Sequence, residues 1–513
     1  MQTTMKDNDV DWTSRARDKF NLTQSEEKLC EKIFSGQRAD YRVDSSNAES
    51  KRLNSPGSEA DWGPDRSLRA EVVTWLCEIS KFWNQVGIGV IEIRGAKIEG
   101  ELRLDNASIN VVLRLLQCCI KGTIYLRNAT LRTIDLEGTY LFPTKVIDDD
   151  SKKRIWCIKA TEAAINGSVR LKNGFSAFGM VDFDNSKING NFQCSDGKFS
   201  NNAGPAFSAK GANIIGDLSL DDGFEPNGDI RLRRAKVGGR LTVDPAINSS
   251  DANNHYNLDL RFAQIGTLYH KSKVWPTKGH LLLNGLVYNA LGRPSNDPNQ
   301  IHDAGWLQMQ PQKSFSEQPY EQLAKVLRSS GDEAAAKKVL IARQDDLRSR
   351  GNLGRLQKLW NLFLGVTIRH GYEPQRAFYG MLLFVFVGFV VFWAADKHHI
   401  MSKDVEHEEI ADEDYPKLNP LLYSLDAFLP IVDLRQKGYW LPNAKKGHVL
   451  FRLSKVDENI KHSSKGVAKR NNARGEVTWG GIVRAYLVIH IMCGWILTTL
   501  WVAGFTGLVR NQN

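Results

Sequence analysis

The chain has 513 residues, with 68 lysine and arginine residues against 58 acidic residues and a formal net charge of +10. This length exceeds a single ordinary hydrophobic core and predicts two to four domains. The positive charges are spread along the sequence without one concentrated stripe, so we expect solvated surface and no nucleic-acid partner. The seven cysteines show no C-x-x-C spacing, which predicts reduced, mostly buried thiols.

The N-terminal segment, residues 1–86, is predicted to be a helical cap. Its first 21 residues are polar and contain no apolar central region, so we expect no signal peptide. Apolar residues recur at three- to four-residue spacing within residues 68–83, namely Val72, Val73, Leu76 and Ile79. This spacing is typical of an amphipathic helix, which we expect to cover the first open edge of the β-structure that follows.

Residues 87–290 are organised by a repeat of five or six residues. Apolar residues recur at this step, and a second apolar or small residue lies two positions before each of them. The first units are at Ile93, Ile98, Leu104, Ile109, Leu115 and Ile120. Residues i and i−2 share one face of a strand, so each unit forms one side of a coil of about 22 residues. The pattern predicts a mainly β fold, a right-handed β-solenoid, with loops at 142–154, 201–206 and 248–256.

After a polar, proline-containing linker at residues 291–318, residues 319–376 are predicted to form a helical hairpin and a basic stalk. Gly331 suits the left-handed end of the first helix, and Asp332 suits the N-cap of the second, which reaches residue 350. The pair is similar to one tetratricopeptide-type helix pair. Because there is only one pair, we favour a role as cap and stalk over a peptide-binding array.

Two apolar segments are long enough to cross a membrane, residues 377–395 and residues 485–509. An α-helix of the second length spans about 37 Å, against a hydrocarbon layer of ~30 Å. Arginines precede the first segment, and acidic residues cluster at 404–414 after it. The positive-inside bias therefore predicts that both termini and the solenoid are cytoplasmic, and that residues 396–484 form an extracytoplasmic loop.

This loop contains an apolar segment, residues 421–434, that is too short to span and is interrupted by Pro430. Two interpretations stay open for it: a re-entrant element with Asp426 and Asp433 lining a cation path, or an interfacial amphipathic element. The second spanning segment contains further candidate intramembrane polar residues, His490, Thr498 and Thr499. His490 is a candidate functional group, or a neutral histidine that hydrogen-bonds a neighbouring helix.

No catalytic, cofactor-binding or metal-binding motif is present in the sequence, which lacks a P-loop, an H-E-x-x-H and a G-x-G-x-x-G after a strand. We therefore expect no cofactor and no catalytic site. Val449, Leu453, Val456 and Ile460 recur at helical spacing among basic residues, which predicts a basic surface helix. Glycines in the second spanning segment permit close helix contact, so we expect a homo-oligomer in the lipid bilayer.

Units such as Ala96-Lys97-Ile98 and Ala107-Ser108-Ile109 resemble a relaxed pentapeptide repeat, with six residues in alternate steps. Several stretches together resemble one family of bacterial inner-membrane proteins with pentapeptide-like repeats: residues 65–77, the solenoid, residues 319–344, 419–434 and 494–510. The resemblance implies a multi-pass protein of the bacterial inner (plasma) membrane. Automatic labels often describe this family as membrane-associated oxidoreductases, which implies a redox cofactor for which these residues give no site.

The main functional hypothesis is a membrane-anchored bacterial protein whose cytosolic solenoid is a binding or sensing surface for an unknown protein or ligand. In this hypothesis the solenoid is coupled to the two-helix membrane domain and has a signalling role. A second hypothesis is an oligomeric ion-conducting pore, or a membrane-depolarising effector, that the solenoid gates. A third, which rests on the family label alone, is a membrane-associated oxidoreductase.

Overall fold

The computed structural model describes residues 12–44, 47–79, 89–143, 155–244, 256–270, 275–276, 279–292, 304–312, 315–404, 415–453 and 475–508. The chain divides into two compact units, Met1–Asp346 and Leu347–Asn513. Residues 293–303 and 313–314 of the predicted linker, residues 144–154 and 248–255 of the predicted loops at 142–154 and 248–256, and the acidic residues 405–414 lie outside the described residues. The same is true of the C-terminal end of the second predicted spanning segment, from residue 509.

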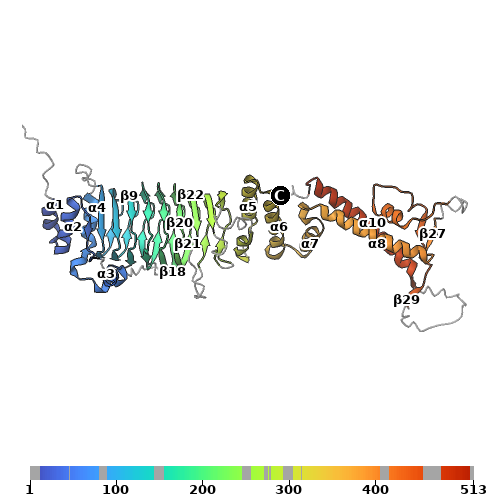
Figure 1. Cartoon of the computed structure of the whole chain (residues 1–513), viewed down its shortest axis with the longest axis horizontal. Helices are drawn as coiled ribbons and strands as arrows, with labels where there is room; N and C mark the ends of the chain where they lie inside the picture. The colour runs from blue at the N-terminus through green and yellow to red at the C-terminus, as the bar shows by residue number, and fades with distance from the viewer. Residues whose placement is uncertain are drawn as a thin grey trace, which may run out of the picture. The chain divides into compact units, whose positions relative to one another are not determined.

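The first unit contains a parallel β-solenoid of about seven turns over residues 90–291, with ~23 residues per turn (Figure 1). This confirms the β-solenoid predicted from the five- and six-residue steps. Equivalent residues of successive turns pair directly: Lys97 is opposite Cys119, which is opposite Tyr140. The pairing is parallel throughout the two 13-stranded sheets, so each turn contacts only the turn before it and the turn after it.

The registers divide each turn into four sides. The first side consists of β2 (Ser67–Arg69), β4 (Lys97–Glu99), β7 (Cys119–Lys121), β10 (Tyr140–Phe142), β14 (Ser176–Ala177) and the first halves of β18 (Lys198–Ser208) and β21 (Glu225–Arg231). The second side consists of β5 (Leu102–Arg103), β8 (Ile124–Tyr125), β11 (Trp156–Lys159), β15 (Met180–Asp182), the second halves of β18 and β21, β23 (Leu258–Asp259) and β25 (Leu281–Leu282).

The other two sides form the second sheet. The third side consists of the first halves of β6 (Ser108–Leu116) and β9 (Thr130–Asp135), then β12 (Ala164–Ile165), β16 (Lys187–Ile188), β19 (Asn213–Ile214) and the first halves of β22 (Lys236–Val243), β24 (Gln264–His270) and β26 (Val287–Leu291). The fourth side consists of β1 (Ala39–Asp40), β3 (Val90–Arg94), β13 (Val169–Arg170), β17 (Phe192–Gln193), β20 (Leu218–Leu220) and the second halves of β6, β9, β22, β24 and β26.

The interior of the solenoid is a column of fully buried apolar side chains. Alternate residues of each strand point inward, so the i and i−2 positions that define the repeat in the sequence are the core positions. In the middle turns the column becomes aromatic, and the ring centroids of Phe183 and Phe192 lie 4.9 Å apart in an edge-to-face arrangement. Phe207 continues the stack at 5.3 Å from Phe192. Each ring buries a large apolar area, which stabilises the turns against each other.

The corners of the coil require special backbone conformations. At the corner between the second and third sides, Asn106, Asn128 and Asn185 have φ values of 58°, 54° and 56°. Asparagine tolerates this left-handed region better than most residues. At the corner between the third and fourth sides, successive turns approach so closely that glycine is needed. A Cβ atom on Gly190 would lie 2.7 Å from the carbonyl oxygen of Gly167 in the preceding turn.

The predicted loop at residues 201–206 is wrong, because β18 runs through it. Its two ends pair with separate parts of β21, and the ladder shifts register between Ser200 and Pro205 and again before Phe207. The extra residues are therefore absorbed as irregularities within a continuous strand that turns a corner.

The first turn of the solenoid is covered by the N-terminal segment. This segment contains α1 (Trp12–Phe20), α2 (Gln24–Phe34), α3 (Ala48–Leu53) and α4 (Ala70–Ile79). Two short strands, β1 and β2, pair with β3 and β4 and so satisfy the exposed backbone edge. The Arg69 guanidinium bonds the buried Glu26 carboxylate at 2.6 Å, which ties α2 to β2. Burial raises the pKa of Glu26, but the hydrogen bonds from Arg69 and the Thr23 backbone outweigh it and leave the pKa below its usual value.

The last turn is covered by α5 (Gln318–Ser329), which is followed by α6 (Glu333–Arg350). The amide of Gln318 accepts a hydrogen bond from Gly285 N and donates one to the carbonyl of Leu286. One turn further along α5, the Gln322 amide donates to the Tyr288 carbonyl at 2.6 Å. Side-chain amides of α5 thus take the place that a further β-strand would have on the last turn.

The second unit contains α7 (Arg355–Ile368), α8 (Gln375–Lys397), α9 (Pro420–Phe428) and α10 (Trp479–Phe505). Two helices, α8 and α10, are long and apolar enough to cross a membrane by length and composition. They overlap the predicted spanning segments at 377–395 and 485–509. The unit also has two antiparallel strand pairs, β27 (Met401–Lys403) with β28 (Trp440–Pro442) and β29 (Val449–Leu453) with β30 (Gly475–Thr478). The helix predicted from Val449 is therefore wrong, because its start is a strand.

We expect Gly190→Ala to destabilise the solenoid by about 1–3 kcal/mol, since the new methyl group would overlap the preceding turn and force the corner apart. The measurement is the midpoint of thermal unfolding of the full chain, followed by the circular dichroism of its β-structure. The control is Lys187→Ala, three residues earlier in the same turn, whose side chain is exposed. Equal midpoints for the two variants would contradict the close stacking at this corner.

Candidate functional site

The first unit has a polar groove where the N-terminal segment meets the corner between the fourth and first sides of the solenoid. We call it the cap groove. It has a volume of about 430 Å³ and is lined by Arg42, Lys51, Asn54, Ser55, Pro56, Gln117, Gly138, Tyr140, Asn173 and Gly174. Two of the lining residues are cationic and none is acidic. The groove therefore suits a polar ligand that carries hydrogen-bond acceptors.

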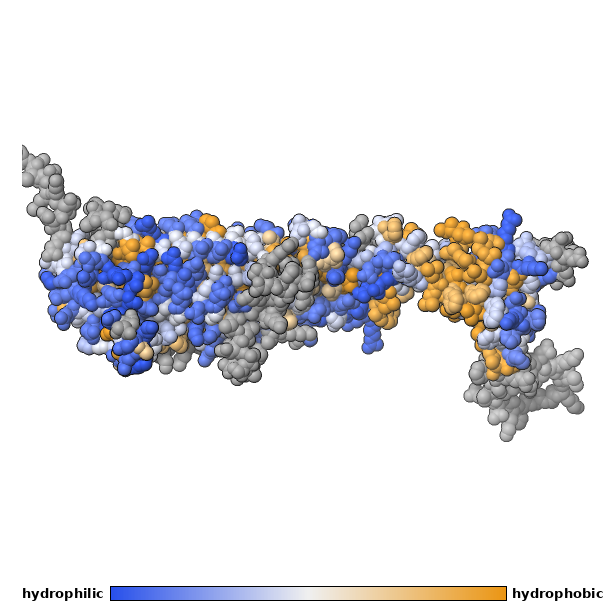
Figure 2. Space-filling model, in the orientation of Figure 1, coloured by the Kyte–Doolittle hydropathy of each residue, from blue (hydrophilic) through white to orange (hydrophobic). Residues whose placement is uncertain are grey.

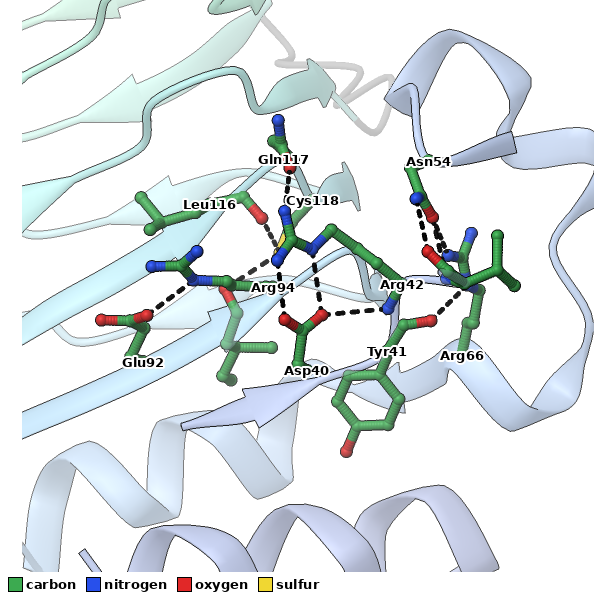
Figure 3. Close-up of polar contacts among 12 residues, drawn as sticks. Asp40, Tyr41, Arg42, Asn54, Arg66, Glu92, Arg94, Leu116, Gln117 and Cys118 are labelled. Carbon is green, nitrogen blue, oxygen red and sulfur yellow. Dashed lines mark hydrogen bonds and ion pairs between the residues drawn. The ribbon is translucent and has the colours of Figure 1, made fainter. Parts of the chain in front are cut away.

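The floor of the cap groove is held by a network around Arg42 (Figure 3). The guanidinium donates to Asp40 Oδ2 at 2.8 Å and to Gln117 Oε1 at 3.0 Å. Burial raises the pKa of Asp40, but the hydrogen bonds from Arg42 outweigh this effect, and the pKa lies below its usual range. The network joins β1 to the corner residue Gln117, so the cap and the solenoid wall form one rigid surface at this point.

The outer wall of the cap groove is fixed by the buried Arg66. Its guanidinium donates to the Tyr41 carbonyl at 2.7 Å and to the Asn54 amide oxygen at 2.7 Å (Figure 3). It also donates to the Leu53 carbonyl at 2.9 Å. The Trp62 ring packs against the same guanidinium at 4.6 Å. Burial lowers the pKa of Arg66. A single buried side chain therefore ties the segment that carries Lys51 and Asn54 to Tyr41, the neighbour of Arg42.

A second hollow of about 400 Å³ lies on the third side of the solenoid, across β19, β22, β24 and β26. Gly238 and Gly266 line it, and because they have no side chains the wall is recessed there. Its rim includes Ile215 and Val287, which are exposed, together with Lys236 and Gln264. This hollow lies on one wall of the solenoid, whereas the cap groove lies between the N-terminal segment and the solenoid.

In the second unit, α9 packs against both α8 and α10, and two glycines make this close approach possible. A Cβ atom on Gly494 of α10 would overlap the carbonyl group of Phe428 at the end of α9. A Cβ atom on Gly388 of α8 would lie 2.6 Å from Cε1 of His490 and closer still to the Ser424 hydroxyl of α9. α9 ends at Phe428, two residues before Pro430, as expected for a helix that a proline interrupts.

His490 is fully buried where α8, α9 and α10 meet. Its Nε2 lies 3.1 Å from the carbonyl oxygen of Ser424, and its Nδ1 lies 3.3 Å from the Tyr486 hydroxyl. A carbonyl oxygen can only accept, so Nε2 carries the proton and Nδ1 accepts from the tyrosine, which describes a neutral imidazole. The Ser424 hydroxyl in turn donates to the carbonyl of Val385 on α8 at 2.8 Å. These bonds join all three helices.

The rings of Phe392 and Phe428 enclose the His490 imidazole, with centroids 5.8 and 5.1 Å away. The imidazole therefore contacts aromatic rings and neutral hydrogen-bonding groups. Such an environment favours the uncharged histidine and a positioning role between helices.

Asp426 is fully buried, and its carboxylate organises the loop that follows α9. It accepts hydrogen bonds from the backbone N–H groups of Leu434, Gln436 and Lys437, each at 2.8 Å. The Lys437 ammonium lies 3.9 Å from the same carboxylate. Three backbone donors satisfy most of the acceptor capacity of a carboxylate, so Asp426 acts as a cap for this loop.

The other sequence candidates lie apart from this cluster. Asp433 is exposed and accepts from the backbone N–H of Arg435. Thr498 is half-buried with its hydroxyl 3.7 Å from the Met381 sulfur, while the exposed Thr499 donates to the Trp495 carbonyl one turn back. The structure thus brings His490 and the 421–434 segment together through Ser424. Whether Asp426, Asp433 or the threonines line an ion path stays a prediction.

Ser424, Gly388 and Tyr486 take part in the cluster and were not singled out from the sequence. Each lies in an apolar segment, where a single serine, glycine or tyrosine carries little signal of its own. No motif in the sequence could have identified them, because the contacts join residues far apart in the chain. Ser424 and His490, for example, are 66 positions apart.

Chemically reactive groups are scarce in the described part of the chain. Among those residues, no group of three or more His, Cys, Asp or Glu side chains could hold a metal ion. Six of the seven cysteines are buried, and burial raises the pKa of the Cys118 thiol to about 12. Such thiols are unreactive at neutral pH. Comparison of the chain with protein-family models, with curated proteins and with solved structures found no match.

We expect Asp426→Ala to accelerate the amide hydrogen exchange of Leu434, Gln436 and Lys437 and to destabilise the second unit by about 1–3 kcal/mol, because three backbone donors lose their acceptor. Hydrogen–deuterium exchange of the full chain in detergent measures the effect. Asp433→Ala is the matched control, since the exposed Asp433 bonds a single N–H. If both variants exchange alike at these amides, Asp426 does not organise the loop.

Proposed function

We propose that this protein is a membrane-anchored solenoid of the bacterial inner membrane that presents its first unit in the cytosol as a binding or sensing surface. The observation that carries the anchoring is the reversed polarity of the second unit. The polar side chain of His490 and the Ser424 carbonyl to which it bonds lie inside this unit. Large apolar side chains of α8 and α10 lie outside. Exposed examples are Leu382, Leu383, Phe386, Trp393, Val488, Ile489, Met492 and Trp495.

The low burial of the two helices supports lipid as their surroundings. Only 22% of the most apolar window of α8 and 33% of that of α10 is buried within the chain. The core helix of a water-soluble protein would be mostly buried, because exposed apolar surface of this extent is unfavourable in water. Figure 2 shows apolar residues gathered over the second unit and mainly hydrophilic residues over the solenoid face in view.

The cap groove supports a binding role for the first unit. It is a preformed polar hollow whose walls are fixed by the Arg42 and Arg66 networks, so a ligand would not have to order the site. The hydrogen bonds of Asp426 and His490 support a structural role for α9 in holding the membrane helices together. For this reason we favour anchoring over ion conduction as the role of the second unit.

The topology of this proposal is tested with two single cysteines in spheroplasts of bacteria that produce the full chain. We expect Lys445→Cys, in the loop between α8 and α10, to react with a membrane-impermeant maleimide in intact spheroplasts. We expect Lys236→Cys, exposed on the solenoid, to react only after the membrane is permeabilised. Reaction of Lys236→Cys in intact spheroplasts, or of Lys445→Cys only after permeabilisation, would contradict the proposed topology.

The binding surface is tested by photo-crosslinking in living cells. A photoreactive amino acid in place of Lys51, at the rim of the cap groove, should give a discrete adduct that mass spectrometry can identify. The same amino acid in place of Glu71, exposed on α4 outside the groove, should give none. Identical patterns at the two positions would count against the cap groove as the binding surface.

A further inference from the structure

The most exposed apolar surface of the second unit outside α8 and α10 is on α7. We call it the α7 apolar face. It consists of five side chains that are between 45% and 82% exposed: Leu356, Leu359, Trp360, Leu362 and Val366. The opposite side of the helix buries Ile368 together with Asn361, whose amide oxygen accepts from the Arg348 guanidinium at 3.3 Å. The large apolar side chains named above therefore lie on the outer side of the helix, where a helix surrounded by water would carry polar residues.

The α7 apolar face is continuous with the surface already assigned to lipid. The helix packs on α8 and α10, and the connection between α7 and α8 is a compact turn over Arg369–Gly371. Arg369 and His370 both adopt left-handed backbone conformations there, with φ of 47° and 55°. Pro374, just before α8, packs against Gly504 near the end of α10. This turn holds α7 beside the N-terminal end of α8 and the C-terminal end of α10.

The charges around α7 are strongly one-sided. Residues 347–376 contain six lysine and arginine residues and one acidic residue, Glu373. The six cations are Arg348, Arg350, Arg355, Lys358, Arg369 and Arg376. Glu373 already pairs with Arg376 at 2.5 Å. A broad apolar face flanked by unbalanced positive charge is the arrangement that binds helices in the plane of an anionic membrane surface.

We infer that α7 lies in the headgroup region of an anionic phospholipid bilayer, with its apolar face toward the acyl chains and its basic residues on the phosphates. The inference rests on the proposed function, since it requires α8 and α10 to span the same bilayer. It adds a second, lipid-selective contact to the membrane anchor. Lipid fits better than a second protein chain because the face is continuous with the spanning helices and its flanking charges are all positive but one.

The test uses the full chain with Cys493→Ser, labelled with a nitroxide at one introduced cysteine and reconstituted in phosphatidylcholine vesicles with or without phosphatidylglycerol. Leu356→Cys reports on the apolar face. Lys358→Cys is the matched control, because two residues along a helix turn the side chain by about 200°. Phe386→Cys on α8 and Lys236→Cys on the solenoid mark the lipid and water limits. Electron paramagnetic resonance gives the accessibility of each label to oxygen and to a water-soluble nickel complex.

In vesicles with phosphatidylglycerol we expect the Leu356 label to be open to oxygen and closed to nickel, like Phe386, while the Lys358 label stays open to nickel. Arg355→Glu with Lys358→Glu should return the Leu356 label to nickel access. A Leu356 label that behaves like Lys236, while Phe386 stays in lipid, overturns the inference and leaves the anchor intact. A Leu356 label that neither oxygen nor the nickel complex reaches indicates protein contact and also overturns the inference. The inference is likewise overturned if the Leu356 label has the same accessibility in vesicles with and without phosphatidylglycerol. Nickel access at Phe386 would overturn the proposed anchor itself.

Discussion

The direct stacking of equivalent residues in successive turns is the constraint on which the first unit depends. Because every strand pairs in parallel with the same strand one turn earlier, whatever stands at a corner must fit under its counterpart in the next turn. This explains both kinds of corner: asparagines in left-handed conformation at Asn106 and Asn128, and close glycines at Gly167 and Gly190. The Asn128 side chain even donates to Asn106 Oδ1 at 3.2 Å, so the corner residues hydrogen-bond along the stack.

The same constraint makes the two ends of the solenoid the places where additional structure is required. A stack of parallel strands leaves one unpaired edge at each end, and an unpaired edge invites association with other chains. The N-terminal segment covers one edge with real strands, and α5 covers the other with glutamine side chains such as Gln318 and Gln322. Covering the first edge with a separate segment also creates the seam in which the cap groove lies. The groove is thus a by-product of edge protection that leaves polar groups, including Lys51, facing a rigid wall.

The solenoid could be predicted from the sequence because its signal is repeated many times, whereas the site could not. The i and i−2 pairs at Ile98 and Ile120 each repeat one local rule, and a single irregular turn does not hide it. By contrast, residues 201–206 look like a loop, since the strand that contains them is defined by the pairing of its two ends with β21, more than 20 positions away. The apparent helix at Val449 fails for a similar reason: three- to four-residue spacing over one short stretch is weak, and pairing with β30 decides its conformation.

The second unit shows the same division between local and distant information. Its apolar segments are visible from composition alone, but the polar groups inside it acquire their roles only from contacts between segments. Asp426 was a candidate for an ion path because a carboxylate in an apolar segment is unusual, yet its oxygens face three backbone N–H groups of the following loop. His490 likewise joins α10 to α9 through Ser424.

A buried polar group with all its partners inside the protein fixes geometry, because no alternative partner exists in lipid. In this unit the fully buried His490 and Asp426 both act through one short helix, α9. His490 fixes that helix against α10, and Asp426 fixes the loop that leaves it, so neither end of the α9 segment can shift without leaving a donor or acceptor unpaired. Apolar contacts are non-directional and would allow α8 and α10 to slide. The polar bonds through α9 therefore supply the positional precision that the apolar surfaces of α8 and α10 cannot.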